Sequence, residues 1–261
     1  MLINTQPLDN LPLWGVYILT VVVFLLSIEG GFRLENLLQK RFPDHAEVSV
    51  AAMVGASLAF LGFFLALITN TAVGIFNERR TLVISEANAI GTTYLRAEYL
   101  EEPISTESRR LLSEYVDVRL SARNPENLAA ALARTEEIHQ ELWSLAVDAA
   151  QSNPSPVASL YIASLNEVID LHTLRVNANL VYRVPPPILL GIYFVAILSL
   201  VLVGVHTSYL GKRNILSLVV MVLILSMVYY LITDLERNQT GLIQVSLQAL
   251  LDLQQQMRPG P

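Results

Sequence analysis

Few side chains in this sequence could carry out a chemical reaction. It has no cysteine, so disulfides, thiolate metal sites and cysteine nucleophiles are excluded. Two pairs of adjacent glutamates, at 101–102 and 136–137, would point to different faces of a helix. The four histidines are scattered without metal-ligand spacing: His45, His139, His172 and His206. No nucleophile elbow, HExxH, P-loop or dinucleotide fingerprint occurs, so we expect no enzyme activity, metal or cofactor.

Several charged side chains that could have a functional role lie in the stretch "NERRTLVISEANAIGTTYLR", residues 77–96. It directly follows a long uncharged run, which places Arg79 and Arg80 just past a lipid boundary. Two interpretations are open. The arginines could anchor a helix to lipid head groups, or several copies around an axis could form a pore mouth that attracts anions.

The same stretch predicts a polar cluster in the region that follows. A helix that carries charged and amide groups so close to an apolar run must satisfy them within the folded domain. Pairing of Glu86 with Arg79, Arg80 or Arg175 is one such solution. The expected cluster consists of Glu86, Asn88, Arg96 and Arg175.

The uncharged run itself contains a stripe of mostly small residues. They recur at intervals of three and four: Gly55, Ala59, Gly62, Phe63, Ala66, Asn70 and Gly74. Such a stripe can serve close packing of membrane helices. It can also line a pore, in which case Phe63 would be a hydrophobic constriction and Asn70 part of a polar lining. The pore-lining candidates are Gly55, Ala59, Phe63, Ala66 and Asn70.

These residues need membrane helices to position them. Hydrophobic residues make up 53% of the chain and charged residues 15%, against roughly a quarter charged in soluble proteins. Four uncharged windows approach or exceed the roughly 20 residues that span a bilayer: 11–28, 48–77, 184–211 and 214–233. We expect the first to be a retained helix rather than a signal peptide, since no Lys or Arg precedes it. The second is about ten residues too long, so it is tilted or projects beyond the lipid.

The middle of the chain, residues 78–183, predicts a helical soluble domain. It holds ten Arg, no Lys and fifteen Asp or Glu, without an alternating strand pattern. The second span should continue into it to about Leu100, because Pro103 ends the helix. Further helix starts are expected at Ser105–Thr106, at Asn124-Pro125-Glu126 and near Val157.

The fold class is therefore an all-α membrane protein with four transmembrane helices and a helical domain inserted between the second and third. The predicted division is transmembrane helices 1 and 2 in residues 1–77, the domain in 78–183, transmembrane helices 3 and 4 in 184–233, and an amphipathic tail helix in 234–261. The apolar stripe of that tail is Ile243, Leu247, Leu250 and Leu251. It is expected to pack on the domain; contact with a partner or subunit is the alternative.

Four spans place both termini and the domain on one side of the membrane. The two short loops on the other side hold five Lys or Arg, against two in the terminal segments. This count favours an extracytoplasmic domain.

Four blocks of the sequence resemble a known family. They are "RRTLVISEANAIGTTYLRAEYL", "LLSEYVDVRL", "LHTLRVNANLVYRVPP" and "DLERNQTGLIQVSLQALLDL", in that order. They resemble the bacterial bestrophin-like membrane proteins of unknown function. A weaker similarity reaches the bestrophins, which are pentameric, mainly anion-selective channels. Their second span carries an "LGF"-like string, here Leu61-Gly62-Phe63, and this implies that Phe63 lies in a narrow neck. The sequence departs from bestrophins in the small Gly55 and Ala59, in "NERR" replacing a tryptophan-rich string, and in lacking a calcium-clasp acidic cluster.

The sequence thus predicts a homo-oligomeric, anion-conducting channel in the bacterial cytoplasmic membrane, with its second span lining the pore. The resemblance implies a pentamer and a cytoplasmic domain. The expected partners are the lipid bilayer, inorganic ions and further copies of the chain. Nucleic acid is not expected, because the net charge is -6. The alternative, suggested by the acidic balance of the domain, is a non-conducting membrane scaffold or sensor whose helical domain binds a partner.

Overall fold

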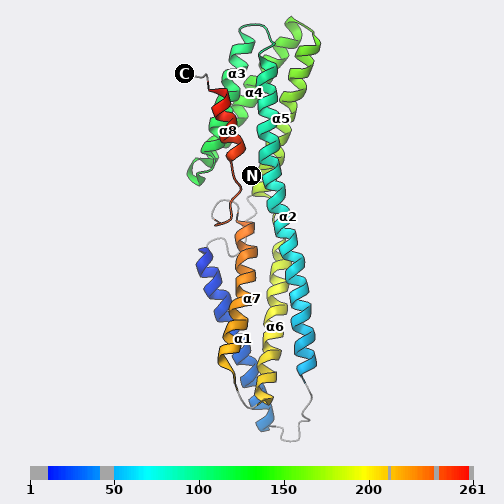
Figure 1. Ribbon diagram of the computed structural model, residues 1–261, viewed down its shortest axis with the longest axis vertical. Helices are drawn as coiled ribbons and strands as arrows, with labels where there is room; N and C mark the ends of the chain where they lie inside the picture. The colour runs from blue at the N-terminus through cyan, green and yellow to red at the C-terminus, as the bar shows by residue number, and fades with distance from the viewer. Residues whose placement is uncertain (1–10, 42–49, 211–212, 238–240, 259–261) are drawn as a thin grey trace.

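A computed structural model describes residues 11–41, 50–210, 213–237 and 241–258. These residues form eight α-helices and one short 3-10 helix, and no strand occurs among them. Figure 1 shows an elongated molecule with a membrane half and a domain half, joined by one long helix. The expected fold class, with four transmembrane helices and an inserted helical domain, is confirmed.

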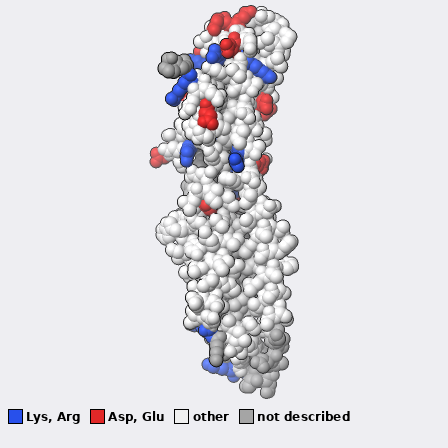
Figure 2. Space-filling model, viewed as in Figure 1, with Lys and Arg blue, Asp and Glu red and all other residues white. Residues whose placement is uncertain are grey.

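Four helices are long and apolar enough to cross a membrane: α1 (Leu13–Arg41), α2 (Ala51–Ala97), α6 (Pro186–Tyr209) and α7 (Ile215–Glu236). Their shared core includes Phe24, Leu61, Leu200, Val222 and Tyr229. Figure 2 shows this half as a white belt, with Lys and Arg below it and charges of both signs above it. The belt is where lipid would cover the protein.

Helix α1 continues well past the window of residues 11–28. Its last turns carry charged side chains that pair with one another and with the α6–α7 loop, since Glu29 bonds both Arg33 and Arg213, at 2.7 and 2.6 Å. In the same part of the molecule, α1 and α6 approach each other closely at one glycine on each helix. A Cβ on Gly31 would collide with the backbone of Val201, and one on Gly204 with that of Ile28. Here the small residues serve close helix packing.

Helix α2 has 47 residues, about 70 Å at 1.5 Å per residue. It ends at Ala97, close to the expected Leu100. Proline is absent throughout it, so no residue removes a backbone hydrogen bond from its interior. The second span therefore projects beyond the lipid and forms one wall of the domain, as Figure 1 shows.

The domain is completed by α3 (Ile104–Ser121), α4 (Leu128–Ser152), α5 (Pro156–Leu180) and α8 (Gln248–Met257). Helix α3 begins at Ile104, near the expected Ser105–Thr106, but those two residues lie inside the helix and do not cap it. The N-cap position is held by Pro103, which has no capping side chain. The carboxylate of Glu102, one residue earlier, accepts from the backbone N–H and the hydroxyl of Thr106, at 3.3 and 2.9 Å. Asn124 does cap a helix start, accepting from the Glu126 N–H at 3.1 Å, but the turn it begins is the 3-10 helix Pro125–Asn127.

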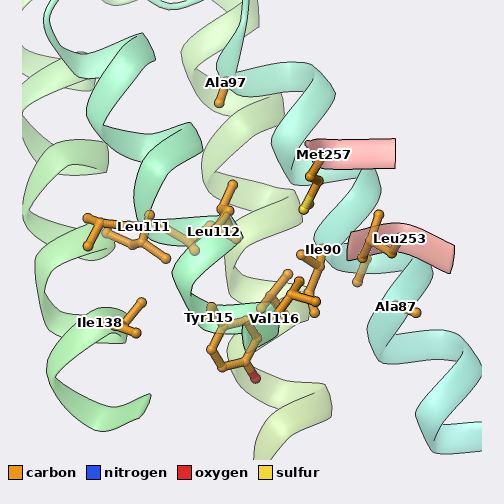
Figure 3. Close-up of a cluster of buried hydrophobic side chains, with 14 of the residues drawn as sticks. Ala87, Ile90, Ala97, Leu111, Leu112, Tyr115, Val116, Ile138, Leu253 and Met257 are labelled. Atoms are coloured by element: carbon orange, nitrogen blue, oxygen red, sulfur yellow. The ribbon is translucent and has the colours of Figure 1, made fainter. Parts of the chain in front are cut away.

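The tail packs on the domain, as expected. Figure 3 shows Leu253 and Met257 of α8 pointing towards Ile90 of α2, near Tyr115 and Val116 of α3. The helix is shorter than the sequence pattern predicts. Asp234 accepts from the backbone N–H groups of Leu242 and Ile243, at 2.6 and 3.1 Å, so this part of the chain is a non-helical strap, residues 241–247.

Candidate functional site

The small-residue stripe of α2 lies on an uncovered face of the helix. The five pore-lining candidates are all exposed: Gly55, Ala59, Phe63, Ala66 and Asn70. Phe63 is 59% exposed, whereas Leu61 and Leu65 on the opposite face are 0% and 4% exposed. The stripe therefore points away from the other three membrane helices of the same chain.

The glycines of this stripe do not serve packing within the subunit. A Cβ placed on Gly55, Gly62 or Gly74 would meet no atom within 4 Å. This contrasts with Gly31 and Gly204, where a Cβ would meet backbone. Packing against a second copy of the chain and lining an aqueous path both remain compatible with the exposed stripe.

The same face continues along α2 into the domain. Residues that follow the stripe at helical spacing are also exposed: Asn77, Arg80, Ile84, Asn88 and Leu95. We refer to the exposed residues from Gly55 to Leu95 on this side as the open face. Gly91, at the same spacing, is only partly exposed, because Leu253 of α8 lies beside it. Asn88 thus belongs to the open face, and it makes no hydrogen bond to the expected cluster partners among the described residues.

The two arginines at the lipid boundary differ in their exposure to solvent and in their partners. Arg80 is exposed on the open face, whereas Arg79 is 2% exposed. The guanidinium of Arg79 donates to three carbonyl groups, of Ala178 at 2.9 Å, Tyr182 at 3.1 Å and Leu235 at 3.4 Å. Arg79 therefore joins α2 to the ends of α5 and α7, and the expectation of a charged mouth narrows to Arg80.

Glu86 lies on the buried face of α2, seven residues from Arg79, and is 0% exposed. Its carboxylate accepts from the Tyr115 hydroxyl at 2.7 Å, from Arg119 Nε at 3.1 Å and from Arg175 Nη1. Burial alone would raise the pKa of Glu86, but the charges of Arg119 and Arg175 outweigh it and lower this pKa to about 2. The carboxylate is therefore ionised, and with its two arginines it forms a buried set with an excess positive charge.

Of the expected polar cluster, the structure brings together only Glu86 and Arg175. The Nη1 atom of Arg96 donates to the carbonyl of Leu160 at 2.8 Å, which ties α2 to α5 elsewhere. The sequence analysis missed Tyr115 and Arg119. They lie four residues apart on α3, inside the "LLSEYVDVRL" block, and that spacing places both on one helix face.

Two of the scattered histidines also meet beside this cluster. The rings of His139 on α4 and His172 on α5 are 5.1 Å apart, and His139 is 5.1 Å from the ring of Tyr115. Burial, together with the charge of Arg119, lowers the pKa of His139 to about 4 and that of His172 to about 3. Both are neutral at pH 7. They border a groove of about 700 Å³ between α4 and α5 that also includes Trp143.

No metal centre accompanies these histidines. Among the described residues, no group of three or more His, Asp or Glu side chains is placed to hold an ion. His206 lies in α6, near its end, and His45 lies outside the described residues.

Solved membrane proteins share this fold. Two variants of a bacterial bestrophin homologue from Klebsiella pneumoniae each give a TM-score of 0.66, at 13% and 14% identity. They cover 93% and 94% of this chain and 96% and 97% of their own. A structure described as a membrane protein gives a TM-score of 0.65 at 14% identity, over 92% of this chain and 95% of its own. A comparison with curated proteins finds no match.

The family itself is identified by sequence. A family model for the bestrophin-like domain matches residues 17–250, which include the four membrane helices apart from the first residues of α1, and the domain apart from most of α8. The resemblance found in the four sequence blocks is thereby confirmed. This chain belongs to the bestrophin-like family.

Proposed function

We propose that the protein is a homo-oligomeric, anion-conducting channel whose subunits place the open face of α2 around a common axis. Characterised members of the family are ion channels. The observation that carries the proposal is the exposure of the open face from Gly55 to Asn88, on a helix whose other face is sealed by its own chain. An uncovered face of this length on a membrane helix needs either lipid, a neighbouring subunit or water beside it.

The composition of the open face favours water and neighbouring subunits over lipid. Asn70 lies within the membrane half, and amide side chains in that environment usually face a bundle interior or an aqueous path. Gly55 and Ala59 leave room near one end, and Phe63 follows them as the largest side chain of the stripe. An exposed ring of Phe63 side chains would form a hydrophobic constriction that gates by dewetting.

Anion conduction is supported by the charge of the open face. Arg80 is its charged member, so each subunit would add one positive charge just beyond the lipid boundary. The domain as a whole is acidic, but many of its carboxylates are paired. Glu114, for example, accepts from Arg110 at 3.0 Å and from Arg134 at 2.7 Å. Local charge near the axis, rather than net charge, would set selectivity.

We place the channel in the bacterial cytoplasmic membrane as a pentamer with the domain in the cytoplasm, following the family. The loop charges favour the opposite orientation, so the side of the membrane on which the domain lies needs a direct test. A reporter enzyme that is active only in the periplasm, fused to the C-terminus, should be inactive in cells. Activity of that fusion would reverse the orientation without affecting the pore proposal.

Purified protein in planar bilayers tests conduction. We expect anion currents, and we expect Phe63→Ala to change them by removing the constriction. Phe194→Ala is the matched control, because Phe194 is similarly exposed, at 61%, but lies on α6. No current, or equal effects of the two variants, would contradict the pore assignment. A closed, tightly packed centre or a monomer on size analysis would instead favour a scaffold or sensor.

A further inference from the structure

A small cavity lies where the domain meets the membrane half. Its volume is about 100 Å³, and it is enclosed by the ends of α3 and α5, the start of α4, Val83 of α2 and the strap 241–247. Four arginines line it, namely Arg79, Arg119, Arg123 and Arg175, and its lining contains no Asp or Glu. A cavity bordered by charge of one sign is a candidate for binding the opposite charge.

The positive charge around this cavity is only partly neutralised by the neighbouring residues. Glu236 and Glu78 lie near Arg79. Glu86 supplies one carboxylate to both Arg119 and Arg175. Arg175 is only 6% exposed, yet its Nε atom is buried without a hydrogen-bond partner among the described residues. A buried guanidinium N–H without an acceptor is costly, and an anion in the cavity would supply the acceptor.

Two further groups near the cavity could act as acceptors for these arginines, but neither balances their charge. The C-termini of α3 and α5 point towards the cavity and carry about half a negative charge each. At the end of α5, however, the carbonyls of Ala178 and Tyr182 already accept from Arg79. At the mouth, the exposed Arg123 donates to Gln244 at 3.4 Å, so it contacts a neutral amide rather than a carboxylate.

We propose that this cavity binds a small oxyanion of the phosphate type, held by Arg119, Arg123 and Arg175. Guanidinium groups present paired N–H donors whose geometry matches an oxyanion. The cavity holds roughly the space of three water molecules, which admits a phosphate group but excludes a nucleotide. The phosphate can belong to a free ion or to a lipid head group, because Arg79 in the same cavity lies two residues beyond the uncharged span. The site is formed within one subunit and goes beyond the proposed pore.

Titration of inorganic phosphate into the full-length protein in detergent tests this proposal by calorimetry. We expect saturable binding of one phosphate per chain. Gln244→Glu would place a carboxylate beside Arg123, and Arg123→Ala would remove the mouth charge. Each should weaken binding roughly tenfold. Both residues are exposed, so the fold should be retained. Gln140→Glu is the control, since it adds the same charge on an exposed site of α4 outside the cavity.

A second arm separates the two sources of phosphate. The protein is placed in nanodiscs of phosphatidylcholine with or without phosphatidic acid, and its thermal unfolding is followed. Phosphatidic acid that raises the unfolding temperature of the original chain, but not of Gln244→Glu, supports a lipid phosphate as ligand. Binding of free phosphate in detergent supports a soluble ion. Binding in neither arm, or equal weakening by Gln140→Glu, would overturn the proposal, whereas absent currents alone would leave it intact.

Discussion

The two faces of α2 show how one helix can serve two environments. On one face, Leu61, Arg79, Glu86 and Ile90 are buried against other helices of the same chain. On the open face, Gly55, Phe63, Asn70, Arg80 and Asn88 lie exposed along the same length. Charged and apolar residues occur on both faces, so polarity does not distinguish them. What differs is whether the chain itself supplies a partner.

The glycines of the membrane helices also differ in whether the chain itself supplies a partner. Gly31 and Gly204 let α1 and α6 approach until a Cβ would overlap backbone, whereas Gly55 and Gly62 on α2 face open space. A small-residue stripe therefore does not by itself indicate close packing against another helix of the same chain. The predictions below test this contrast by changing one face at a time.

The largest effect is expected from Glu86→Ala on the buried face. It would leave Arg119 and Arg175 buried without their carboxylate, which should lower the free energy of unfolding by about 3–5 kcal/mol. Asn88→Ala, two residues away on the open face, should change it by no more than about 0.5 kcal/mol. Urea unfolding followed by circular dichroism measures both, and equal effects would remove the distinction between the faces.

The next largest effect is expected from acid, which should lower the free energy of unfolding through the buried histidines of the domain. His139 and His172 have pKa values of about 4 and about 3 in the folded protein, against about 6.5 when unfolded. The unfolded chain therefore binds more protons below about pH 6.5, and the free energy of unfolding falls as pH decreases, by up to about 1.4 kcal/mol per pH unit for each histidine. Glu86, with its lowered pKa of about 2, adds a further loss only below about pH 4.5.

Replacement of the histidines isolates their share of this pH dependence. The double variant His139→Gln/His172→Gln should unfold with a flatter dependence between pH 6.5 and pH 5. Its stability below pH 4.5 should still fall, because Glu86 remains. An unchanged slope between pH 6.5 and pH 5 would mean that the two rings are accessible to protons in the folded state.

A smaller difference in stability is expected between alanine variants of a glycine packed against another helix and of a glycine on the open face. Gly204→Ala would push α6 away from Ile28 of α1 and should cost about 1–3 kcal/mol. Gly62→Ala meets no atom of its own subunit, so it should leave the stability of the subunit unchanged. Thermal unfolding with size analysis measures both. A change of oligomeric state with Gly62→Ala would show that another copy covers the open face.

The smallest effect is expected for the exposed charge of the open face. Arg80→Ala should lower anion conductance roughly twofold in low salt and less in high salt, since screening weakens a surface potential. Arg110→Ala removes the same charge from α3, where Arg110 pairs with Glu107 and Glu114, and should leave conductance unchanged. Equal conductances of these two variants would exclude Arg80 from the ion path.

Much of the fold was predictable because membrane helices and helix starts have strong local signals. The four spans follow from uncharged length, and the start at Asn124 follows from its capping side chain. The tail shows the limit of this approach. The apolar spacing from Ile243 onwards fits a helix, but a distant carboxylate, that of Asp234, holds the backbone there in another conformation.

The polar cluster was predictable only in part, for a similar reason. Glu86 needed a cationic partner, and Arg175 was among the three expected. The choice between them depended on the faces of α2 that Arg79 and Arg80 occupy, and on where α5, which carries Arg175, crosses α2. Arg119 and the pair His139–His172 come from three other helices, and nothing in their local sequence places them together.

The uninterrupted length of α2 has a mechanical consequence. Glu86 and Phe63 belong to one rod of hydrogen-bonded turns, with neither a proline nor a non-helical residue between them. Torque applied to the domain at Glu86, which is clamped by α3 and α5, must therefore reach Phe63 as a rotation or tilt of the same rod. In a ring of such subunits, a few degrees of twist in the domain would rotate every α2 helix together, and this would widen or narrow the opening that the Phe63 side chains surround.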